Sequence, residues 1–135
     1  MKKILFLLIA AFMLAACASG TSASINGTWK LDSYGSAFDQ VPAAPGVDTS
    51  IEFGSDGRLS GTVGCNQFNG EYQVKGDKIT FGPIASTRKF CEGSVGEQET
   101  TTLVVFIESA AFVIEGDILT LTSAGGSSVV VLAGK

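Results

Sequence analysis

Three cysteines are the residues of this chain best suited to chemistry, and they stand at positions 17, 65 and 91. A thiolate can act as a nucleophile or bind a soft metal ion, and two thiols can instead join in a disulfide. The chain contains no histidine, so a cysteine nucleophile would lack its usual base and a metal site would lack a common donor. We therefore expect no catalytic residue, no metal site and no cofactor.

The first residues have the pattern of an export signal, which decides the redox compartment of these thiols. Lys2 and Lys3 give a basic start, and an apolar run of 11 residues follows from Ile4 to Leu14. That run is shorter than the roughly 20 residues that a transmembrane helix requires, and small residues come after it. We predict a signal peptide over residues 1–16 that is removed on export.

The end of this signal, Leu14-Ala15-Ala16-Cys17, resembles the lipobox of bacterial lipoproteins. The resemblance implies that Cys17 becomes the first residue of the mature chain and carries lipid. Two acyl chains hold a protein stably on a membrane, whereas one binds marginally. Ala18 is not the aspartate that retains such proteins at the inner membrane, so we expect a lipid-anchored envelope protein on the outer membrane, facing the periplasm. The alternative is a soluble secreted protein with a chance cysteine.

Lipidation of Cys17 would leave Cys65 and Cys91 as an even pair in an oxidising location. We expect them to form a disulfide. The two positions are 26 residues apart, for which the chain-entropy estimate is about 3 kcal/mol of stabilisation. A reactive thiol is the alternative.

The mature chain is small and acidic. Removal of residues 1–16 from the 135 leaves 119 residues, a length that suits one domain. The same step removes two of the nine basic residues, so seven remain against thirteen acidic ones and the formal net charge falls from −4 to −6. This balance argues against nucleic-acid binding. We expect a monomer whose partners are the membrane, through the lipid, and an envelope protein.

Period-two alternation of apolar and polar residues dominates the domain that we place at residues 25–135, after a small polar tether at residues 17–24. Alternation of this kind indicates half-buried strands, and the glycine-rich turns between them favour an antiparallel sheet. We predict a mainly β fold, a small antiparallel β-barrel-like and lipocalin-like domain. The apolar positions are Trp29 and Leu31, Ile51 and Phe53, Leu59 and Val63, Phe68, Tyr72 and Val74, Ile79 and Phe81, and Val129 to Leu132.

Three segments are assigned differently. Tyr34 to Ser50 carries two of the three prolines and little periodicity, which indicates a long surface loop. Gly76-Asp77 and Gly116-Asp117 occupy matching positions in two similar segments, which indicates two hairpins. An α-helix is predicted over about Gly96 to Ser109.

The predicted helix rests on two observations. Ser94-Val95-Gly96-Glu97 has the form of a capping box, which is typical of a helix start. Leu103, Phe106, Ile107 and Ala110 then fall on one helical face. The β-branched residues of the same segment favour strand instead; they are Thr100, Thr101, Thr102, Val104 and Val105.

Four motifs stand out along the domain: "GTWKL" from Gly27, "GCNQFNGEY" from Gly64, "IASTRKFC" from Ile84 and "EQE" from Glu97. Together they resemble the META domain of HslJ-like bacterial lipoproteins, over about Ile25 to Leu132. The resemblance implies a small barrel-like β fold with one helix, and an association with heat shock, envelope stress and novobiocin resistance. It supplies no enzymatic reaction. The phenylalanine in "RKFC" departs from the methionine that related sequences often have.

The family-motif residues have a structural interpretation that suffices. Glycine tolerates positive φ and asparagine bonds its own backbone in turns, which suits Gly64, Asn66 and Gly70 between strands. Aromatic residues such as Trp29, Phe53, Phe68, Tyr72 and Phe81 are expected in the core, or alternatively around a ligand cavity. Thr87, Arg88 and Lys89 form a short basic cluster that could receive an anion or pair with Glu71 or Glu92.

Three function hypotheses follow. The first is a non-enzymatic envelope lipoprotein that acts by structural or protein contacts under stress. The second is a module that binds a small apolar ligand in the barrel interior. The third is an enzyme that uses Arg88 with Glu71, or Glu71 with Glu52 as a glycosidase-like pair; we expect those glutamates to lie on solvated strand faces instead.

Overall fold

The computed structural model describes residues 23–135. The predicted signal peptide, Cys17 and most of the predicted tether lie outside these residues. Between residues 23 and 135, no helix combines the length and the apolar character needed to cross a bilayer.

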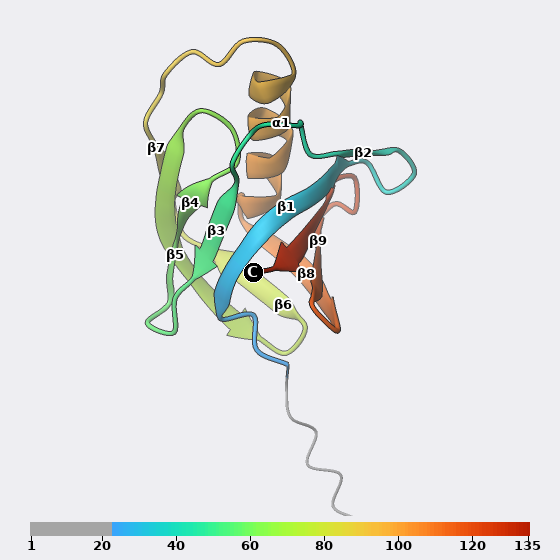
Figure 1. The fold of residues 1–135 in the computed structure, drawn as a ribbon. Coiled ribbons are helices and arrows are strands. Elements are labelled where there is room, and N and C mark those ends of the chain that lie inside the picture. The colour runs from blue at the N-terminus through green and yellow to red at the C-terminus, as the bar shows by residue number, and fades with distance from the viewer. Residues whose placement is uncertain (1–22) are drawn as a thin grey trace, which may run out of the picture.

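Eight antiparallel strands form a closed barrel, as Figure 1 shows, and the described chain has a single α-helix. The strands follow the spatial order β10-β9-β8-β6-β5-β4-β3-β1, and β1 pairs with β10 to close the ring. Closure leaves no long unpaired strand edge in the ring. The bounds are β1 Gly27–Gly35, β3 Ser50–Phe53, β4 Arg58–Thr62, β5 Gln67–Lys75, β6 Lys78–Phe81, β8 Ser109–Glu115, β9 Ile118–Ser123 and β10 Val129–Gly134.

Two short strands extend this ring. β2 (Gln40–Pro42) pairs with the end of β1, and β7 (Ala85–Ser86) pairs with the start of β5. The predicted hairpins are confirmed: β5 turns into β6, and β8 into β9, through two-residue turns that begin with Gly76 and Gly116. Both glycines have positive φ, at 64° and 63°, as such turns require at this position.

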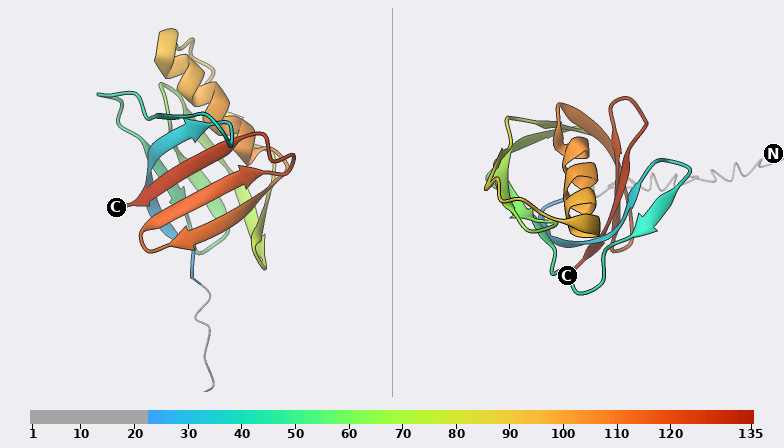
Figure 2. Two further views of the ribbon diagram at one scale, coloured as in Figure 1. Left: turned by 90° about the vertical axis from the view of Figure 1, so that its right-hand side faces the viewer. Right: turned by 90° about the horizontal axis from the view of Figure 1, so that it is seen from above.

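The barrel interior is packed with side chains, in agreement with the predicted aromatic core. Phe106 is fully buried at the centre, where its ring stacks on Phe68 at 5.6 Å and meets Phe81 edge-on at 5.2 Å. The indole N–H of Trp29 donates to the carbonyl of Ile25 at 2.8 Å. Seen from above, the helix lies across the mouth of the barrel (Figure 2), so it closes that end.

The helix differs from its prediction at both ends. α1 runs over Gly93–Leu103 and continues as a 3₁₀ turn, η1, over Val104–Phe106. The helical segment ends because Ile107 is extended, with φ −93° and ψ 126°, and Glu108 follows with a positive φ of 67° before β8 begins. Ile107 is consequently outside the helix, and 61% of its surface is exposed instead of packed.

The predicted capping box is wrong. Glu92 stands at the N-cap and makes no capping hydrogen bond from its side chain to any described residue. Because α1 begins at Gly93, Ser94 lies inside the first turn and not at the position where a side chain can cap it.

Two further expectations need correction. The segment from Tyr34 to Ser50 is not one long loop, because β1 extends to Gly35, β2 lies within the segment and β3 begins at Ser50. Val74 was expected to share the buried face of β5 with Tyr72. It is exposed because it lies near the hairpin tip of β5, next to the turn at Gly76.

Candidate functional site

Asn66, in the connection from β4 to β5, is the centre of a buried polar cluster. Its side-chain oxygen accepts from the main-chain N–H of Lys89 at 2.7 Å and from the hydroxyl of Thr87 at 3.0 Å. Its side-chain nitrogen donates to the carbonyl of Lys89 at 3.0 Å and to Oε1 of Glu99 at 2.6 Å. Each donor and acceptor of this amide is therefore satisfied, as a buried amide requires.

Glu99 brings α1 into the same cluster. Its Oε2 accepts from the main-chain N–H of Asn66 at 2.8 Å, so two donors of one residue face one carboxylate. The side chain is only 8% exposed. A buried carboxylate is costly unless hydrogen bonds compensate for its lost hydration, and Asn66 supplies them.

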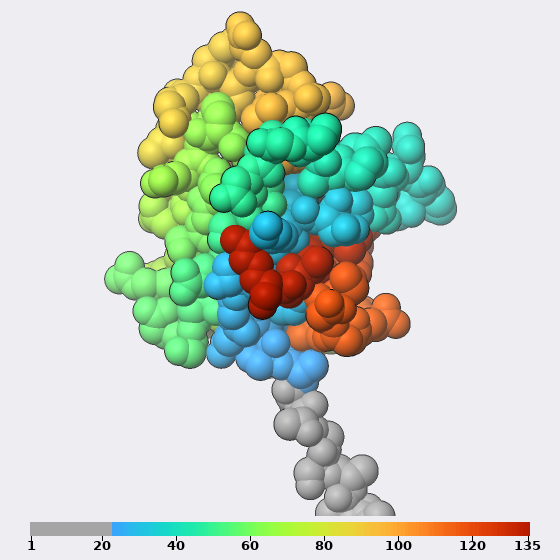
Figure 3. Space-filling model, viewed as in Figure 1, coloured from blue at the N-terminus to red at the C-terminus, as the bar shows by residue number. Residues whose placement is uncertain are grey.

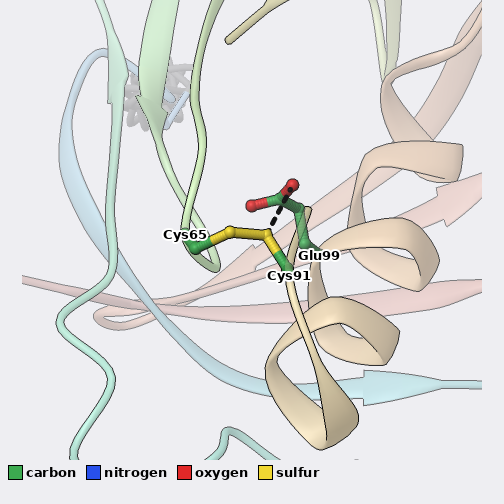
Figure 4. A group of neighbouring side chains, drawn as sticks. All are labelled: Cys65, Cys91 and Glu99. Atoms are coloured by element: carbon green, nitrogen blue, oxygen red, sulfur yellow. Dashed lines mark hydrogen bonds between the residues drawn. A yellow bond between two sulfur atoms is a disulfide. The ribbon is translucent and has the colours of Figure 1, made fainter. Parts of the chain in front are cut away.

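The Cys65–Cys91 disulfide closes the cluster on the other side, and the predicted pairing is present. The two Cα atoms are 5.9 Å apart, within the range that a disulfide spans. Figure 4 shows Glu99 reaching from α1 toward Cys91, with 3.6 Å between Oε1 and the sulfur. A disulfide sulfur carries no proton and cannot donate a hydrogen bond, so the carboxylate only packs against the bridge.

Gln98 makes a second polar connection from α1. Its side-chain oxygen accepts from the main-chain N–H of Ala44 at 2.6 Å, and its side-chain nitrogen donates to the carbonyl of Val63 at 2.7 Å. The side chain is fully buried. Two segments distant in sequence, the end of β4 and the stretch after β2, are thus joined to the helix.

Gly64 is required by the close approach of the β4–β5 connection to α1. A Cβ placed there would lie 2.6 Å from the Cβ of Glu99 and 3.1 Å from the carbonyl oxygen of Val95. Gly96 plays the matching part on the helix, since a Cβ there would collide with the carbonyl oxygen of Cys91. The two glycines let α1 pack against the disulfide-bonded backbone.

The remaining family-motif residues of β5 belong to the core. Phe68 is buried against Phe106, and Gly70 lies under the chain at Pro83, where a Cβ would be 3.1 Å from the carbonyl oxygen. The hydroxyl of Tyr72 is 2.6 Å from the carbonyl of Gly54. Burial, followed by the nearby charge of Asp56, raises the pKa of Tyr72 above its ordinary value.

Thr87, Arg88 and Lys89 lie in the loop that the cluster holds. The hydroxyl of Thr87 also accepts from the main-chain N–H of Gln67 at 3.0 Å. Arg88 and Lys89 have exposed side chains, and the pairing with Glu71 or Glu92 that was one of the two alternatives is not formed within residues 23–135. The ion pair of the described chain joins Arg58 to Asp56 at 3.8 Å.

An open groove of about 480 Å³ lies beside this loop. One wall is formed by Lys89, Phe90 and Cys91, and the opposite wall by α1. The residues that α1 contributes are Gly93, Gly96, Glu97, Glu99, Thr100 and Thr101.

The cluster contains sulfur and carboxylate atoms of the kinds that bind metal ions, but its cysteines are not thiolates. The ligand atoms of Cys65, Cys91 and Glu99 lie within 4.8 Å of one another. Metal ions are bound by thiolates, and both sulfurs are joined in the disulfide. The cluster is therefore an arrangement that holds backbone segments in place.

Glu52 and Glu71, considered above as a catalytic pair, are exposed residues of different strands.

Sequence reasoning missed the polar inner face of α1. The buried residues of the helix are Gln98, Glu99 and Thr102. Hydrophobic periodicity could not reveal them, because the pattern that marks a buried helical face is apolar. The available signal was the "EQE" motif itself, in which Glu97 points outward while the next two residues are buried.

Comparisons with known proteins agree with this architecture. Three solved structures share the fold: an NMR structure of a protein from Burkholderia xenovorans, with 21% identity, TM-score 0.66 and 82% of each chain covered; a second NMR structure, with 23% identity, TM-score 0.61 and 80% of this chain and 88% of that chain covered; and a crystal structure of a DUF4847 family protein from Bacteroides vulgatus, with 17% identity, TM-score 0.56 and 82% and 93% covered.

At these identities the likeness concerns the fold alone. Among curated proteins, none matches the chain significantly. The sequence pattern of the META domain matches residues 22–135, which includes every strand of the barrel and the cluster around Asn66. The chain belongs to the META domain family.

Proposed function

We propose that this protein is a non-enzymatic lipoprotein of the bacterial envelope, anchored through Cys17, whose META domain acts by contacts with another envelope protein under stress. The observation that supports the proposal is that the cluster residues are already bonded to one another and to the backbone. Cys65, Cys91, Asn66 and Glu99 bond one another and the backbone, so the groups best suited to chemistry are engaged in holding a surface loop.

The packed interior supports contacts at the surface over binding inside the barrel. Phe53, Phe106 and Leu121 are fully buried within it, and the pockets lined by Lys89, by Ser50 and by Pro83 are open grooves. An apolar ligand in the barrel is the competing function. Native mass spectrometry of the purified protein should show the mass of the processed chain alone. A stoichiometric small molecule that survives gentle ionisation would favour the competing function.

The anchor and its membrane are tested by fractionation. The wild-type protein should be recovered with outer membranes, and a Cys17→Ser variant should appear in the soluble fraction, because it lacks the thiol that carries lipid. Cys65→Ser with Cys91→Ser is the control, since it also removes cysteines but leaves Cys17. Membrane retention of the Cys17→Ser variant would contradict the lipoprotein proposal.

The stress role rests on the family resemblance and requires a phenotype. A deletion strain of the host bacterium should survive heat or novobiocin less well than its parent. Expression of the wild-type protein should restore survival. If Cys17→Ser restores it equally, the anchor is not needed for the role.

A further inference from the structure

We propose that the loop of residues 87–90 and the groove beside it, here called the display loop and the display groove, dock an extended acidic segment of a partner protein. Carboxylates of that segment would face Arg88 and Lys89, and an apolar side chain would pack on Phe90. The inference deepens the proposed function, on which it rests, by naming the surface and the chemistry of the partner.

The backbone of the display loop is fixed at several points. The N–H and carbonyl of Lys89 both bond the side chain of Asn66, at 2.7 and 3.0 Å. The N–H of Thr87 donates to the carbonyl of Gln67 at 3.0 Å, and the disulfide at Cys91 holds the far end. A loop held in this way loses little conformational entropy on binding, which favours affinity.

Three side chains of the same loop, those of Arg88, Lys89 and Phe90, are exposed to solvent. Phe90 is 87% exposed, and Arg88 and Lys89 are exposed without an ion pair among residues 23–135. Aromatic residues and arginine are enriched in the energetically important parts of interfaces. Two adjacent cations in a domain with a formal excess of acidic residues also favour an anionic partner.

The display groove indicates an extended peptide. Gly93 leaves the start of the helical wall without a side chain, and a Cβ placed there would meet nothing within 4 Å, so a partner backbone can come close to α1 at this position. Glu92 and Glu97 are exposed near this wall and would repel a uniformly acidic ligand. The carboxylates of the partner must therefore lie toward Arg88 and Lys89, with neutral residues along the helix.

The position of the loop favours a protein over the membrane of the anchor. The display loop and the start of α1 project from the end of the domain opposite to the one where β1 begins, as Figures 1 and 3 show. If the lipid anchor precedes β1, the display loop faces away from that membrane. An acidic protein segment is then the anionic partner within reach.

The test is selection from a phage-displayed library of short random peptides on residues 18–135, which contain the complete closed barrel. Selected peptides should combine Asp or Glu with an apolar residue. Their affinities are then measured for Arg88→Glu with Lys89→Glu, and for Phe90→Ser. Lys75→Glu with Lys78→Glu is the matched charge control on the β5–β6 hairpin, and Phe38→Ser is the control for loss of an exposed phenylalanine.

We expect each display-loop variant to lose about tenfold or more in affinity, and each control to stay within about twofold, with unchanged thermal unfolding. Peptide-induced amide shifts in NMR spectra should map to the loop and the first half of α1. Selection of peptides without acidic residues, or equal binding by loop variants and controls, would overturn the proposal. So would loop-dependent binding to phosphatidylglycerol vesicles in place of peptides. None of these outcomes depends on lipidation, so failure of the peptide test would not contradict the proposal of an envelope lipoprotein.

Discussion

The carboxylate of Glu99 accepts hydrogen bonds from both the main-chain N–H and the side-chain amide of Asn66, at 2.8 and 2.6 Å. One residue belongs to the helix that closes the barrel and the other to the connection between β4 and β5. The pair thus fixes α1 against the barrel wall, and through the contacts of Asn66 with Thr87 and Lys89 it also fixes the display loop.

Glu99→Gln should destabilise the protein although it preserves shape. The new amide would place an N–H₂ group against one of the two donors of Asn66, leaving a buried donor unsatisfied, at a cost of about 1–3 kcal/mol. Urea unfolding with the disulfide intact measures this free energy. Glu97→Gln, on the exposed side of the same helix, is the control and should change stability by about 0.5 kcal/mol or less. Equal effects of the two variants would show that the pair contributes nothing specific.

Removal of the disulfide should cost stability and loosen the display loop. Cys65→Ser with Cys91→Ser is expected to lower the free energy of unfolding by about 3 kcal/mol, since the bridged residues are 26 positions apart in sequence. In the wild-type protein neither thiol should react with an alkylating agent until reductant is added. Labelling of the folded, unreduced protein at these positions would contradict the bridge.

Much of the fold was predictable because local patterns express it. Alternation along Trp29 to Leu31 and along Ile79 to Phe81 reports which strand face is buried, and Gly-Asp at two positions reports where hairpins turn. The pairing of Cys65 with Cys91 followed from the count of thiols.

The cluster was not predictable in the same way because its partners are distant in sequence. Asn66 bonds Glu99 across 33 positions, and Gln98 bonds Ala44 across 54. Each of these residues looks locally like a turn residue or an exposed helical polar residue. These residues come together only in the folded barrel. The apolar pattern used to predict the helix therefore did not identify the buried face of α1, which includes Thr102.

Gly64→Ala should destabilise the protein through a collision and not through backbone conformation. The added methyl group would lie 2.6 Å from the Cβ of Glu99, so α1 must shift away from the barrel. Overpacking of this kind typically costs about 1–3 kcal/mol. Thermal or urea unfolding measures it. Gly125→Ala, where no atom beyond the two neighbouring residues lies within 4 Å of the new Cβ, is the control and should be nearly neutral. A Gly64→Ala protein as stable as this control would refute the close-approach argument.

Alkaline pH should weaken the fold through its two tyrosines. Burial raises the pKa of Tyr34 and of Tyr72 above 10.0, with smaller contributions from the charges of Glu97 and Asp56. Since each folded pKa exceeds the unfolded one, the stabilisation is complete below about pH 10 and is lost as the pH rises through the folded value.

Urea unfolding at neutral and alkaline pH, together with the ultraviolet absorbance of tyrosinate, measures both effects. Tyr72→Phe should cost about 1 kcal/mol at neutral pH, because it removes the hydroxyl that bonds Gly54. The difference between this variant and the wild type should then shrink above pH 10, where the wild type loses the contribution of Tyr72 and the variant has none to lose. Lysines also titrate in this range, but they are common to both proteins and cancel in the difference. A stability difference that stays constant as tyrosinate forms would show that burial of Tyr72 is not linked to its ionisation.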